Sequence, residues 1–75
     1  MPEGELSNNV RRMRFDNGEM TQQDLADRVG VTRQTIHSIE TGKYNPSIEL
    51  ALRLARELGT AVEDLFELDD REKAS

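Results

Sequence analysis

Residues 21–42, TQQDLADRVGVTRQTIHSIETG, contain two short runs in which apolar residues recur at helical spacing, and a glycine follows each run. Thr21 and Asp24 have the spacing of a capping box, with Asp in place of the usual Glu or Gln. Thr32 can cap a second helix soon after Gly30. The pattern predicts two short helices joined by a tight turn, which is a helix-turn-helix.

Glycine, proline and capping residues divide the rest of the chain into three more helices. We expect Ser7 or Asn8 to cap the first helix, Ser47 the fourth and Thr60 the fifth. The expected helices cover about residues 8–17, 21–29, 32–41, 47–58 and 61–66. The sequence therefore predicts an all-α fold, a compact bundle of five helices.

The expected core consists of apolar residues at helical spacing. It comprises Val10, Met13, Phe15, Met20, Leu25, Ala26, Val29, Ile36, Ile39, Ile48, Leu50, Ala51, Leu52, Leu54, Ala55 and Leu58. Apolar residues cover most of the circumference of the helix over 47–58, so this helix is expected to be the most buried.

Seventy-five residues suffice for one core, so we expect a single domain over residues 8–68 with its motif at 21–42. Residues 1–7 are expected to be an N-terminal arm and residues 69–75 a charged, flexible tail. The sequence has no cysteine, which excludes disulfides, thiolate zinc sites and cysteine nucleophiles. It shows neither a membrane-spanning run nor the features of a secretory signal, so a cytoplasmic location is expected.

The net charge of −5 is unevenly distributed along the chain. Residues 1–8 carry −2, residues 9–46 carry +1 and residues 47–75 carry −4. A modestly basic face can therefore exist on an acidic protein, although its long-range attraction to phosphate will be weak. Acidity by itself favours a protein-interaction module, and that alternative remains open.

The outward positions of the helix over 32–41 carry an unusual mixture of side chains. They are Thr32, Arg33, Gln34, His37, Ser38 and Thr41. An ordinary exposed helix is rich in Glu and Lys pairs, whereas these amides, hydroxyls and an arginine match the hydrogen-bonding edges of DNA bases. A short exposed helix of this kind is suited to the major groove of DNA.

The run TQQDLADRVGVTRQTIHSIETGKYNPS over residues 21–47 resembles the phage-repressor and Cro-like helix-turn-helix proteins, the XRE family. The likeness covers about residues 8–66 and is strongest to minimal regulators that consist of a lambda-repressor-like DNA-binding domain alone. One departure is the two-residue spacer Glu19-Met20, where many members of the family have a single residue.

The resemblance implies a role for ten residues of the motif and the loop after it. Those implied to read bases are Arg33, Gln34, His37 and Ser38. Those implied to contact the DNA backbone are Gln22, Thr32, Thr41, Lys43, Tyr44 and Asn45. Backbone contacts set the register of a protein on DNA, and base contacts set its sequence preference.

The resemblance also implies a short terminal β-ribbon, in which a strand around residues 66–68 pairs with one near Leu6. This end of the molecule is then the expected homodimer contact, through Leu65, Phe66 and Leu68. The alternative is that these apolar residues seal the base of the monomer.

Several polar residues have two interpretations from sequence alone. Arg11, Arg12 and Arg14 form a basic cluster that either is solvated or contacts phosphate. Glu40 is expected to pair with Arg28 or to cap a local network. Tyr44 can pack against its turn as readily as it can bind a phosphate.

Neither catalysis nor a bound cofactor is indicated by the sequence. His37 has no partner at metal-ligand spacing and is poorly placed to activate the adjacent Ser38, so we expect no metal, no cofactor and no enzyme activity. No membrane or small-molecule partner is indicated. The expected function is sequence-specific regulation of transcription, by a dimeric repressor that occupies a palindromic operator in double-stranded DNA. The alternative is a protein-interaction adaptor or an antitoxin-like component with the same fold.

Overall fold

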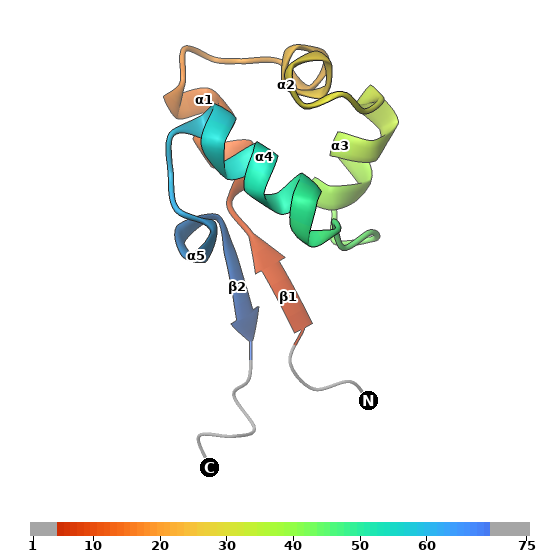
Figure 1. Ribbon diagram of the computed structural model, residues 1–75, viewed down its shortest axis with the longest axis vertical. Coiled ribbons are helices and arrows are strands. Elements are labelled where there is room, and N and C mark those ends of the chain that lie inside the picture. Colours follow the sequence, from red (N-terminus) through yellow and green to blue (C-terminus); the bar gives the residue numbers. More distant parts are fainter. Residues whose placement is uncertain (1–4, 70–75) are drawn as a thin grey trace.

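The computed structural model describes residues 5–69, which form five helices and a two-stranded antiparallel ribbon (Figure 1). In chain order the elements are β1 (Glu5–Asn8), α1 (Val10–Asp16), α2 (Gln22–Val29), α3 (Arg33–Glu40), α4 (Ile48–Leu58), α5 (Val62–Leu65) and β2 (Phe66–Asp69). The expected five-helix bundle and its terminal ribbon are both confirmed.

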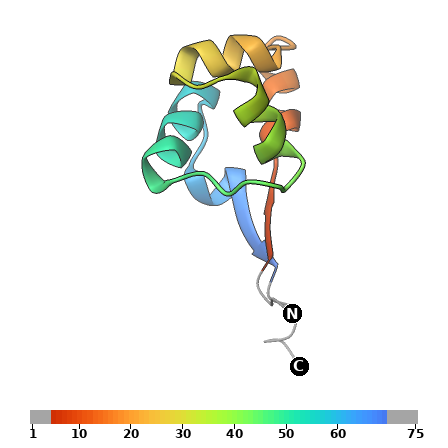
Figure 2. The ribbon, with the colours of Figure 1, turned by 90° about the vertical axis from the view of Figure 1, so that its right-hand side faces the viewer.

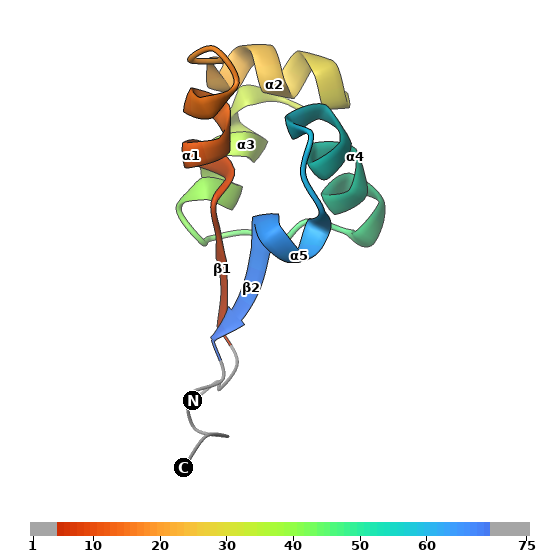
Figure 3. The same ribbon diagram turned by 90° about the vertical axis from the view of Figure 1, so that its left-hand side faces the viewer.

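The helices are grouped at one end of the molecule, and the ribbon of β1 and β2 projects from them to form the other end (Figures 1 and 3). Helices α2 and α3 pack against each other as the two arms of the helix-turn-helix, and α4 packs against α2. Figure 2 shows α3 at the surface of the bundle, where it continues directly from the turn after α2. Within residues 5–69, no helix has the length and apolar character needed to cross a bilayer.

Three of the predicted helix starts are confirmed by side-chain caps. Thr21 Oγ1 accepts a hydrogen bond from the Asp24 backbone N–H at 3.0 Å, and the reciprocal bond completes the capping box. Thr32 Oγ1 accepts from the Thr35 N–H at 3.2 Å, and Ser47 caps α4 in the same way. The motif helices therefore begin at the residues predicted from sequence.

The turn between α2 and α3 depends on Gly30, which has a φ of 82°. This left-handed conformation is open to glycine at little cost, whereas a β-carbon would strain it. The Gly30 N–H donates to the Ala26 carbonyl at 2.8 Å and so closes the last turn of α2. The chain can then reverse within two residues and place α3 across α2.

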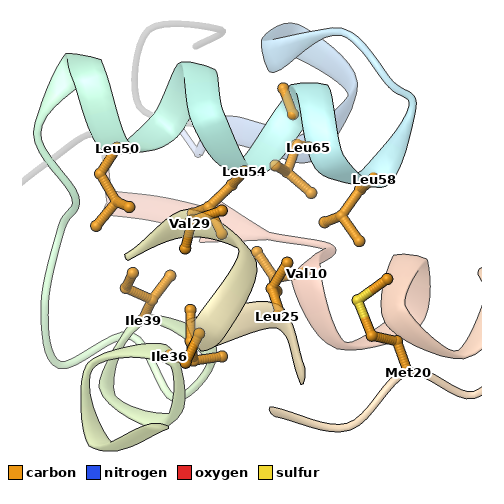
Figure 4. Packing of buried hydrophobic residues seen from close by; sticks show 12 residues of the cluster. Val10, Met20, Leu25, Val29, Ile36, Ile39, Leu50, Leu54, Leu58 and Leu65 are labelled. Atoms are coloured by element: carbon orange, nitrogen blue, oxygen red, sulfur yellow. The ribbon is translucent and has the colours of Figure 1, made fainter. Parts of the chain in front are cut away.

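All five helices contribute to one apolar core (Figure 4). Its fully buried large side chains are Val10, Leu25, Ile36, Ile39, Leu54 and Leu65. Val10 comes from α1 and Leu65 from α5, so the core joins both ends of the described chain to the helix-turn-helix. Burial of these side chains is the main force that fixes α3 on the bundle.

One predicted helix cap is wrong, and another acts from a different position. Residues 5–8 pair with β2, so Asn9 takes the N-cap position of α1, where its side chain makes no capping bond. Asn8 Oδ1 nevertheless accepts from the Val10 N–H at 3.1 Å, so Asn8 binds the first N–H of the helix from one residue outside the cap position. The fifth helix follows Ala61, whose side chain cannot cap it, so Thr60 does not have the predicted role.

Three of the predicted core residues lie at the surface. Phe15 is 50% exposed, and Ile48 and Leu52 on α4 are 80% and 54% exposed. Helix α4 is therefore buried on one side only, through Leu50, Leu54, Ala55 and Leu58. The surplus of apolar residues on α4 leaves an apolar strip facing solvent.

The ribbon pairs Leu6 with Leu68 and Asn8 with Phe66. These four residues share one face, because side chains alternate along a strand. The expected N-terminal arm is thus a strand from Glu5 onward. Of the expected tail, Asp69 ends β2, and residues 70–75 lie outside the described part of the chain.

Candidate nucleic-acid interface

Helix α3 presents one apolar and one polar side. Ile36 and Ile39 are buried, and they hold the inner side of the helix against the core. Arg33, Gln34 and His37 are exposed on the outer side. The helix is thus a surface ridge, anchored by its inner side, whose outer side chains can reach another molecule.

Two of the predicted base-reading residues already bond to each other. The Gln34 amide donates to Ser38 Oγ at 3.3 Å, and Ser38 is only partly exposed. Because the contact is long and lies at the surface, it can be exchanged for bonds to a ligand at small cost. Arg33 has no ion-pair partner among the side chains of residues 6–68, so its guanidinium is available for a bidentate contact.

A buried ion pair lies behind this ridge. Arg14 on α1 donates through Nε to Glu40 Oε2 at 2.6 Å and through Nη2 to Glu40 Oε1 at 3.1 Å. Its third bond runs from Nη1 to the Met20 carbonyl at 2.7 Å. The two side chains are only 8% and 6% exposed. The pair therefore ties α1 and the loop before α2 to the last turn of α3.

Gln22, at the start of α2, connects this pair to the ridge. Its Nε2 donates to Glu40 Oε1 at 2.9 Å and lies 3.4 Å from His37 Nδ1. A carboxylate can only accept, so the amide nitrogen must face Glu40, and its second hydrogen is then directed towards Nδ1. This arrangement favours the His37 tautomer that carries its proton on Nε2.

The residues predicted to contact the DNA backbone lie around the ridge, and their side chains differ in how far they are exposed to solvent. Thr32 and Thr41 are exposed, but their hydroxyls are engaged: Thr32 caps α3, and Thr41 Oγ1 donates to the His37 carbonyl at 3.0 Å. Lys43, Tyr44 and Asn45 follow α3 and are exposed. Gln22 is partly buried, and its amide hydrogens are engaged with Glu40 and His37.

A groove of about 460 Å³ lies between α1 and α3. Its lining comprises Arg11, Arg14, Phe15, Gln22, Arg33, His37, Glu40 and Thr41. The groove therefore brings α1 beside four residues that the sequence assigns to base or backbone contacts: Gln22, Arg33, His37 and Thr41.

The predicted partner of Glu40 is wrong. Glu40 pairs with Arg14, whereas Arg28 lies 3.6 Å from Glu57 on α4. Arg14 was expected to be solvated or to contact phosphate together with Arg11 and Arg12, but it is buried. Sequence gave no signal for the pair, because it depends on how α1 crosses α3.

The three predicted dimer residues have different environments. Leu65 is completely buried in the core of its own chain, which excludes it from a contact surface in this conformation. Phe66 is partly buried and packs against the core, and Leu68 is 62% exposed. The interpretation that these residues seal the base of the monomer therefore holds for Leu65.

Comparison with known proteins agrees with this architecture. A family profile described as helix-turn-helix matches residues 12–65. An HTH-type transcriptional regulator of Archaeoglobus fulgidus is 51% identical over 63 residues, which are 84% of this chain and 89% of that protein. Another from Methanothermobacter thermautotrophicus is 53% identical over 62 residues, with 81% and 88% covered. The Bacillus subtilis regulator YgzD is 40% identical over 65 residues, with 87% and 97% covered.

Solved structures of regulators share the fold. The restriction-modification controller protein C.AhdI from Aeromonas hydrophila aligns with a TM-score of 0.69 and 28% identity, covering 75% of this chain and 83% of its own. The hypothetical transcription factor NHTF from Neisseria aligns with a TM-score of 0.71 and 26% identity, covering 88% and 74%. The chain therefore belongs to the XRE-type helix-turn-helix family, the family of these transcriptional regulators.

Proposed function

We propose that the protein is a sequence-specific DNA-binding regulator of transcription that inserts α3 into the major groove. The observation that carries this proposal is the exposed polar ridge of α3, where Arg33, Gln34 and His37 project from a helix fixed by buried isoleucines. Arginine recognises guanine and glutamine recognises adenine through paired hydrogen bonds. Such bonds discriminate between bases only if the helix is held rigidly, and the Arg14–Glu40 pair supports that rigidity.

The regulator acts as a homodimeric repressor in this proposal. One short helix reads only a few base pairs, whereas two copies about 34 Å apart read a palindrome. Leu6 and Leu68 lie opposite each other on one face of the ribbon, and Leu68 is largely exposed, which supports this face as the dimer contact. A dimer that occupies an operator in a promoter would exclude the polymerase, and this mode of action places the protein in the cytoplasm with the chromosome.

Selection of bound sequences from a random pool of duplexes tests the proposal. We expect an enriched palindrome whose half-sites are one helical turn apart. The double variant Arg33→Ala/Gln34→Ala should retain the fold and lose the preference for the enriched sequence. Gln23→Ala on α2 is the matched control, since Gln23 is exposed and bonds only to Asp27 among the described side chains. It should bind as the unmodified protein does.

Two outcomes would overturn the proposal in different ways. If the double variant kept its sequence preference, the proposal that α3 recognises the bases would be wrong. If the unmodified protein bound no duplex even at low salt, the adaptor or antitoxin-like alternative would be favoured. The exposed apolar residues Ile48 and Leu52 on α4 would then be the first surface to test for a protein partner.

A further inference from the structure

We infer that the groove between α1 and α3 seats a phosphate of the DNA backbone, with Arg11 as its principal ligand. This inference rests on the proposed function and extends the interface to α1. From sequence, Arg11 could equally have been an ordinary solvated residue. Its place in the groove beside Gln22, Arg33 and His37 distinguishes it from Arg12, and its exposure distinguishes it from the buried Arg14.

The charge of the groove favours an anion. Arg14 and Glu40 cancel each other, because their ion pair is closed at 2.6 Å and almost inaccessible. Arg11 and Arg33 remain, and neither has an ion-pair partner where the structure describes side chains, in residues 6–68. Two uncompensated guanidinium groups on a shared concave surface are suited to an anionic oxygen ligand. This local charge is notable on a protein with a net charge of −5.

Phe15 explains how Arg11 is held in place. The Arg11 guanidinium carbon lies 5.7 Å from the centroid of the Phe15 ring, and that of Arg14 lies 5.5 Å from it. A cation at this distance from an aromatic ring is attracted by the ring's negative face. Phe15 is half exposed rather than buried, so it positions Arg11 at the surface. Arg14 also contacts the Phe15 ring, and because its ion pair with Glu40 fixes its guanidinium, it helps to hold the ring in place.

Of the other polar residues that line the groove, His37 can supply a further donor to a phosphate on the path of the DNA. The donors of Gln22 and Thr41 are engaged within the chain, whereas His37 is exposed and its Nε2 is directed to neither of these partners. A phosphate seated there would be held between α1 and α3, so it would set the depth to which α3 enters the major groove. Arg11 would then contribute to the register of the protein on DNA without reading its sequence.

The test measures how affinity depends on salt concentration, using fluorescence anisotropy with the selected duplex and a scrambled one. Arg11→Ala should weaken binding to both duplexes about three- to tenfold and reduce the slope of log K against log salt by about one. Arg12→Ala is the matched control, because it removes the same charge from the adjacent position, which does not line the groove between α1 and α3. Arg12 lines a neighbouring hollow, whose lining shares Arg11, Phe15 and Glu40 with the groove. The Arg12→Ala variant should leave the slope unchanged.

Phe15→Ala tests the positioning of Arg11. It keeps the charge, so we expect weaker binding at fixed salt, by about twofold, with the slope unchanged. Arg11→Lys should likewise keep the slope, since it retains a cation without the planar guanidinium. Thermal unfolding will show that each variant is folded, as expected for exposed positions.

Each outcome bears on a different claim. An unchanged slope for Arg11→Ala, or an equal reduction for Arg12→Ala, would overturn the phosphate seat while leaving DNA binding intact. Unchanged affinity for Phe15→Ala would overturn the positioning role. Absence of binding by the unmodified protein at low salt would overturn the proposed function itself, and the phosphate seat with it.

Discussion

The guanidinium of Arg14 and the carboxylate of Glu40 form a two-bond ion pair inside the fold, with an Nε–Oε2 distance of 2.6 Å. Arg14 lies on α1 and Glu40 in the last turn of α3, so the pair joins the first helix to the helix that carries the DNA-contacting residues. Gln22 accompanies it and adds α2 to the same network. Three helices are therefore fixed relative to one another by a few polar contacts as well as by the core.

Removal of one member of this pair should be costly. Arg14→Met or Glu40→Leu leaves a buried charge without its partner, and we expect each to lower the free energy of unfolding by about 3–5 kcal/mol. The double variant Arg14→Met/Glu40→Leu should lose much less than the sum of the two single losses. Urea unfolding of the four proteins measures this, and additive losses would show that the two charges act independently.

Gln22 should control the tautomer of His37. The chain has one histidine, so its ring nitrogens can be assigned without ambiguity by nitrogen NMR. On the neutral imidazole we expect the proton on Nε2, and Gln22→Ala should shift the ring towards the mixture of an unrestrained imidazole. A donor on Nε2 would favour base acceptors such as guanine O6 or thymine O4. Gln23→Ala is the control and should leave the spectrum unchanged. A proton on Nδ1 in the unmodified protein would contradict the geometry.

Replacement of Gly30 should affect stability through the backbone alone. A β-carbon there would lie 3.7 Å from Arg53 Nη1, an ordinary contact, so the penalty comes from the φ of 82°. We expect Gly30→Ala to cost about 1–2 kcal/mol and Gly30→Asn to cost less, since Asn adopts the left-handed conformation more readily. Urea unfolding compares the three proteins. Equal stability of the Ala variant would mean that the turn has another conformation in solution.

The two leucines near the end of the described chain should behave differently. Leu65→Ala creates a cavity in the core and should lower the free energy of unfolding by about 2–5 kcal/mol. Leu68→Ala removes an exposed side chain and should change the stability of the monomer by less than about 0.5 kcal/mol. If the ribbon face is the dimer contact, the Leu68→Asp variant should remain folded, and sedimentation should show that its association is weaker. An unchanged dimer would move the contact elsewhere.

The local features of the fold could be predicted from sequence because each depends on neighbouring residues. The Thr32 cap requires only a hydroxyl three positions before a backbone N–H, and the turn at Gly30 requires only a residue that tolerates positive φ. The positions of Arg33 and Gln34 on the outer side follow from the helical repeat once Ile36 and Ile39 are placed inside. The helix-turn-helix and its outward face were therefore accessible without a structure.

Contacts between distant helices could not be predicted in this way. On α1 the inward positions are Val10 and, four residues later, Arg14, so a charged residue occupies a place that an apolar pattern assigns to a hydrophobic one. The pattern therefore assigned Phe15 to the core instead. The predicted partner of Glu40 was wrong for the same reason. A buried Arg14 is costly unless its charge is paired, and Glu40 is the carboxylate that pairs with it.

Asn8 connects the ribbon to the C-terminal end of α3. Its amide donates to the Ile39 carbonyl at 2.9 Å, while its backbone belongs to β1 opposite Phe66. An isolated two-stranded ribbon is only marginally stable, so its opening is an easy motion compared with unfolding of the helices. Each opening would release the end of α3 from one of its anchors. A contact that keeps β1 paired with β2 would therefore also hold the C-terminal end of α3, the helix proposed to meet DNA. The Asn8 side chain is the connection between the two.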